Sequence, residues 1–282
     1  MSSGEIIVLG AIAGLTIFLG LPVGRVRGLS PMWRALLNAG AAGVLVFLLI
    51  ETVGHAFEPV EKAVEDKEWG EFLLRAPIFL VAFAVGLLGL VYYDRWVHRR
   101  AHPATPQSSV GPGAASTSEF GIAGRVAALS EPKRLALLIA IGIGVHNLAE
   151  GLAIGQSAES GALNLAVLLV IGFALHNATE GFGIVAPLTS ESVQPSWAFL
   201  VTMGLIAGSP TFIGTVIGQS FTNENLEIAF LALAAGSILY VIVQLLRVAA
   251  KLDHDQVHVM WGLFLGVVLG FATELILVAA GL

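Results

Sequence analysis

The sequence predicts an all-α integral membrane protein, a bundle of about eight transmembrane helices. The chain of 282 residues is 56% hydrophobic and only 12% charged, whereas a soluble domain carries about 25% charged residues. So few charges cannot cover the surface of a water-soluble protein of this size. The chain also contains many apolar runs of roughly 18 residues or more, the length that a helix needs to cross a bilayer.

Each predicted span is an apolar run between charged or proline-containing breaks. The runs are too long for membrane β-strands of about 10 residues and lack alternation, so a β-barrel is excluded and helices remain. The first run has no basic residue before it and no small-residue cleavage site after it, so we interpret it as a span. The predicted spans cover residues 5–24, 35–57, 72–93, 134–155, 162–187, 197–218, 226–247 and 259–281.

The basic residues of the loops predict the orientation. Eleven of the 14 Lys and Arg residues fall on one side of the spans, which the positive-inside rule assigns to the cytoplasm. Both termini are then extracytoplasmic, and we expect a multi-pass protein of the cell membrane. Residues 98–131, rich in Ala, Ser, Gly and Pro, are expected to form a cytoplasmic linker between spans 1–3 (residues 1–97) and spans 4–8 (residues 132–282).

The segment at residues 58–71, on the opposite side, is the most acidic part of the chain. It contains six acidic residues and two lysines. We expect it to be an extracytoplasmic loop. Such a loop is either simply solvated or a funnel that raises the local cation concentration.

One polar hexapeptide pattern, HNxxEG, occurs twice within the predicted spans. HNLAEG begins at His146 in span 4, and HNATEG begins at His176 in span 5. An ionisable side chain near the centre of a membrane helix costs about 2.5 to 3.5 kcal/mol, so it is usually there for a function. A hydrogen-bond network that only holds helices together could use one such pair, but two identical patterns on neighbouring helices favour a functional site.

Helical geometry predicts that the two patterns form one metal site. In each copy the histidine and the glutamate are four residues apart and share a face, with the asparagine beside the glutamate. The short connection at residues 156–162 makes spans 4 and 5 antiparallel neighbours, so the two faces can meet. Imidazole, carboxylate and amide oxygen suit Zn²⁺, Fe²⁺, Mn²⁺ or Co²⁺, and the chain has no cysteine that would suit Cu(I). The predicted metal ligands are His146, Asn147, Glu150, His176, Asn177 and Glu180. We interpret most of the glycines around them, among them Gly151 and Gly181, as small-residue packing positions.

These motifs resemble those of the ZIP (Zrt/Irt-like) family of divalent metal transporters, whose fourth and fifth helices carry His-Asn-x-x-(Asp/Glu)-Gly and related motifs. The resemblance covers the whole chain, with eight spans, external termini and a variable cytoplasmic loop between spans 3 and 4. It implies that the six residues line a single or binuclear metal site midway along the path. It also implies inward transport of an ion such as Zn²⁺, Fe²⁺, Mn²⁺, Co²⁺ or Cd²⁺, and a homodimer. The metal ion is then the substrate, so we expect neither a cofactor nor enzymatic activity.

The sequence departs from the common pattern of this family at four positions. Ala149 and Thr179 stand where many members have a proline before the acidic residue. Thr211 in span 6 and Gln244 in span 7 are neutral where many members carry an acid. The resemblance therefore implies a less anionic core site, with weaker binding or fewer ions.

Three further polar residues are candidate accessory groups on the pathway, together with Thr211 and Gln244. Glu51 and His55 are four residues apart near the outer end of span 2, and Glu274 lies in the outer half of span 8. They are either an entrance relay for the cation or a proton, or ordinary interfacial hydrogen-bonding groups.

Two other function classes compete with transport. A haem-binding membrane cytochrome could take axial ligands from His55, His146 and His176, but haem ligation does not need the accompanying Asn and Glu. An intramembrane metal-dependent hydrolase needs a general base beside an open metal position, and the sequence has no HExxH motif. Nothing in the sequence indicates nucleic-acid binding, so the expected partners are the metal ion, the lipid bilayer and a second copy of the chain.

Overall fold

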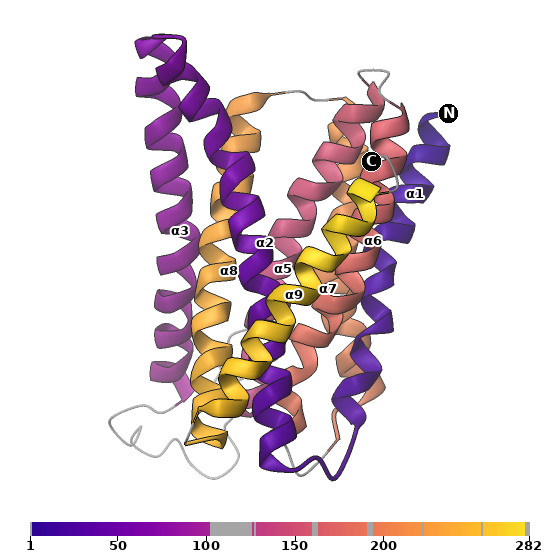
Figure 1. The fold of residues 1–282 in the computed structure, drawn as a ribbon, viewed down its shortest axis with the longest axis vertical. Helices are drawn as coiled ribbons and strands as arrows, with labels where there is room; N and C mark the ends of the chain where they lie inside the picture. The colour runs from indigo at the N-terminus through magenta and orange to yellow at the C-terminus, as the bar shows by residue number, and fades with distance from the viewer. Residues whose placement is uncertain are drawn as a thin grey trace, which may run out of the picture.

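The computed structural model describes residues 2–101, 126, 128–159, 163–190, 194–220, 223–254 and 256–279. Throughout these residues the regular structure is helical, with no β-strand, and six of the described helices are long and apolar enough to cross a membrane. The prediction of an all-α membrane protein is therefore confirmed (Figure 1). The α-helices are α1 (Ser3–Leu15), α2 (Pro31–Glu65), α3 (Trp69–Ala101), α5 (Glu131–Glu159), α6 (Leu163–Val185), α7 (Trp197–Gly218), α8 (Glu224–Leu252) and α9 (Val257–Ala279). The 3₁₀ segments are η1 (Thr16–Leu19), η2 (Leu21–Arg25) and η3 (Ala186–Ser190).

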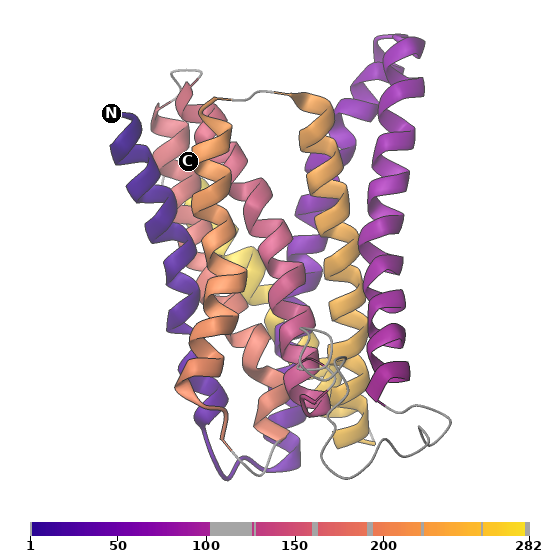
Figure 2. The ribbon, with the colours of Figure 1, turned by 180° about the vertical axis from the view of Figure 1, so that it is seen from behind.

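The helices pack as two groups. Helix α5 packs along α7, and α1 packs against α6 and α7; we call these four helices the motif group. Helix α2 packs along α8 and α9, and α3 packs along α8; we call these four the flanking group. The two groups meet chiefly where α5 contacts α8, with smaller contacts between α2 and α6. Figure 2 shows the side of the bundle on which α7 and α8 lie in front.

Glycine allows the backbones of the motif group to approach closely. A Cβ atom at Gly151 of α5 would overlap the carbonyl oxygen of Thr211 on α7, and one at Gly214 of α7 would overlap that of Leu148 on α5. A Cβ atom at Gly181 of α6 would overlap the carbonyl oxygen of Ile17 in η1. Small residues at membrane helix interfaces permit this kind of packing. The structure therefore supports the interpretation of Gly151 and Gly181 as packing positions.

The first predicted span is not a single regular helix. Helix α1 ends at Leu15, and the chain continues as η1 and η2 before it leaves the bundle. Gly20, between the two 3₁₀ segments, lies directly against α6, because a Cβ atom there would be 2.5 Å from the carbonyl oxygen of Ala178. Pro22 in the first turn of η2 has no N–H to donate. The chain therefore passes α6 in 3₁₀ turns at the place where the two backbones are in close contact.

The expectation of a loop at residues 58–71 is wrong. Helix α2 continues to Glu65 and α3 begins at Trp69, so only a short turn separates them. The helix continues because Val60 and Ala63 are buried on one face, while Glu58 and Lys62 on the exposed face form an ion pair of 2.6 Å four residues apart. Four of the six acidic residues therefore lie on helix ends, and Asp66 and Glu68 lie in the turn between them. Most of the predicted linker at residues 98–131 lies outside the described residues; its first residues, 98–101, continue α3.

The two ends of the bundle are formed by different turns and termini of the chain. The N-terminus and the α2–α3 turn lie at one end, which we call the N-terminal end (Figures 1 and 2). The connection from η2 to α2 and the start of α5 lie at the other, which we call the linker end. The distribution of basic residues assigns the linker end to the cytoplasm as an expectation.

Candidate metal site

The two motifs meet through their asparagines. Asn147 Nδ2 on α5 donates a hydrogen bond of 2.8 Å to Asn177 Oδ1 on α6, and both side chains are fully buried. Asn147 Nδ2 also donates to the carbonyl of Ala207 on α7 at 3.0 Å, and Asn177 Nδ2 donates to the carbonyl of Ala13 on α1 at 3.1 Å. The two amides therefore connect all four helices of the motif group.

The amide arrangement leaves one oxygen available at the centre of the site. Among the described residues, Asn147 Oδ1 is buried and accepts no hydrogen bond, which is unusual for a buried polar atom. Asn177 Oδ1 already accepts from Asn147. Of the two amides, Asn147 is thus the better placed to offer oxygen to an ion.

The histidine and both glutamates gather beside this amide pair. His146 Nε2 lies 3.1 Å from Glu150 Oε1 and 3.9 Å from Glu180 Oε1, so one imidazole joins carboxylates from α5 and α6. All three residues are at most 5% exposed. On the other side of the ring, His146 Nδ1 lies 3.4 Å from Thr52 Oγ1 of α2, which helps to fix the ring orientation. Two carboxylates and one imidazole are therefore concentrated among buried side chains.

The second histidine of the repeat cannot be placed in the same way. His176 precedes Asn177 on α6, but its side chain lies outside the described residues. Among the side chains that the structure does describe, no group of three or more His, Asp and Glu residues meets the geometry of a metal site by itself. The described part of the candidate site is thus His146, Asn147, Glu150, Asn177 and Glu180.

A cavity of about 340 Å³ leads from this site toward the N-terminal end. His146 and Glu150 lie at its inner part, together with Ala149 and Ala153 of α5. Its wall on the flanking group is rich in carboxylates from α2 and α8, with a single lysine among the described lining residues. The charged and imidazole groups of this wall are Glu51, His55, Glu58, Lys62, Glu224 and Glu227. The cavity therefore connects the buried site to an acid-rich mouth.

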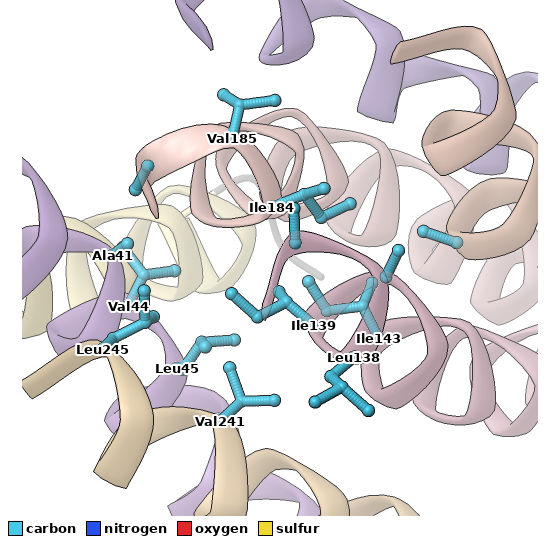
Figure 3. Packing of buried hydrophobic residues seen from close by; sticks show 14 of the residues in the cluster. Ala41, Val44, Leu45, Leu138, Ile139, Ile143, Ile184, Val185, Val241 and Leu245 are labelled. Atoms are coloured by element: carbon cyan, nitrogen blue, oxygen red, sulfur yellow. The ribbon is translucent and has the colours of Figure 1, made fainter. Parts of the chain in front are cut away.

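Apolar side chains close the bundle on the other side of the site. Ile139 and Ile143 on α5 and Ile184 on α6 are at most 1% exposed, and each lies on the linker-end side of its motif. Figure 3 shows these side chains between α2, α5, α6 and α8, where they face residues from the flanking group. The labelled partners there are Ala41, Val44, Leu45, Val241 and Leu245. We call this set the apolar cluster.

The predicted accessory residues fall in different places. Glu51 and His55 line the cavity above the site. Thr211 is fully buried on α7 and packs against α1, 3.1 Å from where a Cβ atom on Gly14 would lie. Gln244 lines a separate groove at the linker end, and Glu274 lies on α9, outside the set of described residues that line the cavity.

Sequence reasoning missed several residues of the cavity wall. Thr52 was not singled out, although it lies next to Glu51 and contacts His146. Glu224 and Glu227 were not predicted either, although they are three positions apart in the first turn of α8 and so share a face. Glu224 is also held from α3, because Arg75 Nη2 donates to its Oε2 at 2.6 Å.

Comparison with known protein families identifies the family of the chain. A family model described as ZIP zinc transporter matches residues 122–277, more than half of the chain. The match includes α5, α6, α7 and α8 and thus both copies of the motif. A search of curated proteins found no match. The family match confirms the resemblance seen in the motifs. It favours a transporter over the two alternatives, a haem protein and a hydrolase. The chain belongs to the ZIP zinc transporter family and is a multi-pass membrane transporter of divalent metal ions, not an enzyme.

Proposed function

We propose that the chain carries Zn²⁺, and with it Fe²⁺, Mn²⁺, Co²⁺ or Cd²⁺, across the cell membrane into the cytoplasm by alternating access. The observation that supports this most directly is the buried group formed by His146, Glu150 and Glu180 at the inner end of an acid-lined cavity. Two buried carboxylates are costly unless a cation compensates them. A divalent ion supplies that charge.

The donor set suits this choice of metals. In the proposal, Glu150, Glu180 and His146 bind the ion, and Asn147 adds its buried oxygen. His176 is proposed as a further ligand from α6, and Asn177 fixes the amide of Asn147 as well as lying at the site. Nitrogen and oxygen donors without sulfur favour Zn²⁺ and its neighbours over Cu(I).

The direction of transport is proposed from the position of the cavity. The cavity opens toward the end of the bundle that the basic residues assign to the outside. Its carboxylates would raise the cation concentration above the site. The apolar cluster has no described ligand for an ion, so release toward the linker end requires it to separate. A movement of the motif group past the flanking group would separate it, since the cluster joins residues of both groups.

The proposal is tested with purified protein in liposomes. Glu150→Ala and Glu180→Ala should each abolish Zn²⁺ uptake, because each removes a buried charge that binds the ion. Glu68→Ala, in the exposed α2–α3 turn, is the matched control and should transport normally. Equal membrane yield and an unchanged elution profile show that the variants fold. Normal uptake by both site variants would place the site elsewhere, and a competition series of ions with the wild-type protein ranks the metals.

A further inference from the structure

A second polar cavity lies at the linker end of the bundle, between α5 and α8. This groove has a volume of about 410 Å³. Arg134 of α5 and Arg247 and Lys251 of α8 line it, and Glu131 is the one carboxylate among its described lining residues. Three cationic side chains and one anionic side chain give the groove a net formal charge of +2. Such a charge repels a divalent metal ion, so the groove is not suited to the exit of the transported substrate.

Two of the three cationic side chains of the groove, Arg247 and Lys251, are open to a ligand from outside the chain. Arg247 and Lys251 are four residues apart on α8, so they project from one face of the helix. Both are exposed, and neither has an ion pair or hydrogen bond with any residue that the structure describes. Arg134 faces them from α5 and is only 7% exposed. A buried arginine opposite two exposed cations forms a pocket with depth, which a flat surface patch lacks.

We propose that this groove binds a phosphate-bearing anion, either the headgroup of an acidic phospholipid or a soluble phosphate. Guanidinium groups match phosphate oxygens with paired hydrogen bonds. Tyr240 and Gln244 add a hydroxyl and an amide to the same lining. Basic pockets between membrane helices on the cytoplasmic side recognise anionic lipid headgroups by this chemistry, and the basic-residue distribution assigns the linker end to that side.

The position of the groove gives the bound anion a regulatory role, and this part rests on the proposed function. Helix α5 belongs to the motif group and α8 to the flanking group, and the apolar cluster joins the same two helices beside the groove. An anion held by Arg134 on one side and Arg247 on the other ties the groups together at this end. It therefore stabilises the arrangement in which the linker end is closed, and it slows transport.

Binding is tested on the purified full-length protein without any transport measurement. Thermal stability is titrated with dioctanoyl phosphatidic acid, with dioctanoyl phosphatidylcholine and with inorganic phosphate. The test variants are Arg247→Gln and Lys251→Gln, both at exposed positions that leave the buried Arg134 in place. Arg27→Gln is the matched control, because it removes one exposed positive charge from the same end of the bundle outside the groove.

The expected result is stabilisation by phosphatidic acid with an apparent Kd that is about fivefold weaker in each test variant and unchanged in Arg27→Gln. About fivefold corresponds to roughly 1 kcal/mol for each basic residue near an anionic lipid. If phosphatidic acid binds and inorganic phosphate does not, the source is a lipid; equal binding of inorganic phosphate with the same dependence on the variants identifies a soluble anion. The proposal is overturned if neither anion stabilises the protein, or if Arg27→Gln weakens binding as much as the test variants.

The regulatory role is tested by Zn²⁺ uptake into phosphatidylcholine liposomes with and without phosphatidic acid. Wild-type uptake should be slower with the acidic lipid, and uptake by Arg247→Gln should not change. Lipid binding without any effect on uptake would refute the regulatory role and leave the site intact. Absence of uptake in both kinds of liposome would instead refute the proposed transport function, which the binding titration does not assume.

Discussion

Replacement of Gly151 by alanine tests how closely the motif group is packed. Gly151 follows Glu150 on α5, and its Cα faces the backbone of α7. An added Cβ atom would overlap the carbonyl oxygen of Thr211 and lie 2.9 Å from the amide nitrogen of Thr215. Both are backbone atoms in a helix, so no rotation of a side chain can relieve the overlap. The two helices have to move apart.

The size of the effect follows from two opposing contributions. Overpacking of a well-packed interior typically costs about 1–3 kcal/mol, and contact with backbone places Gly151→Ala at the upper end of that range. Alanine regains up to about 1 kcal/mol over glycine in a helix interior. The expected net loss of stability is therefore about 2 kcal/mol. Because Glu150 is the adjacent residue, the displacement also moves the carboxylate, and metal transport should fall sharply.

Gly183→Ala is the control for this experiment. Gly183 is also buried on a motif helix, but an added Cβ atom would lie no closer than 3.8 Å to its nearest neighbour, the Cβ of Ala41. That is an ordinary contact, so the helical preference of alanine should raise stability by roughly 0.5–1 kcal/mol. Thermal unfolding of the two variants in the same detergent should thus shift in opposite directions. If Gly151→Ala is stabilised as much as Gly183→Ala, α5 and α7 do not pack at this distance.

Three further outcomes are expected. Asn147→Ala should lower stability by about 2 kcal/mol or more and abolish transport, because it removes two buried hydrogen bonds and leaves the buried Asn177 Oδ1 without the donor that the structure describes; unchanged thermal unfolding would contradict the amide link between the helices. Metal affinity measured at equilibrium should fall as the solution is acidified from pH 8 to pH 5, because protons and metal compete for the same imidazole and carboxylate groups; a flat profile would exclude these ligands. Single cysteines at Ala153, which lines the cavity, and at Ile184, in the apolar cluster, should change their labelling rates in opposite directions when metal is added; a parallel change would favour an open channel.

The fold could be predicted from the sequence because the bilayer imposes a single length scale. Apolar runs of the right length predicted a helical membrane protein, since a helix must be about that long to cross the hydrocarbon region. The thickness of the bilayer does not predict whether a helix continues beyond the membrane. Helix α2 runs to Glu65 through the segment that was expected to be a loop, because Val60 and Ala63 bury one face there. The break of the first span into 3₁₀ turns was also beyond prediction, since it depends on the contact of Gly20 with α6.

The candidate site could be predicted only as far as local spacing reaches. The repeat predicted that the motif faces of spans 4 and 5 can meet, and in the structure a hydrogen bond joins Asn147 on α5 to Asn177 on α6. The partners from other helices could not be predicted in the same way. Thr52 approaches His146 from α2, and Glu224 is held over the cavity by Arg75 of α3. The residue pattern of one helix does not predict which other helices pack against it. The contacts of Thr52 and Glu224 could therefore be identified only from the packing of the whole bundle.

The division of roles within the site explains why the repeat carries an amide as well as two ionisable groups. The attraction between a carboxylate and an ion changes when the ion enters or leaves, so it cannot hold the helices in both states. The amides of Asn147 and Asn177 are neutral, and their bonds to each other and to the carbonyls of Ala207 and Ala13 do not involve the ion. Under the proposed function, these bonds would keep α1, α5, α6 and α7 together in both the loaded and the empty state. A transporter that moves its site as one body requires such a link, and it follows that the asparagines matter even where they give the ion no ligand.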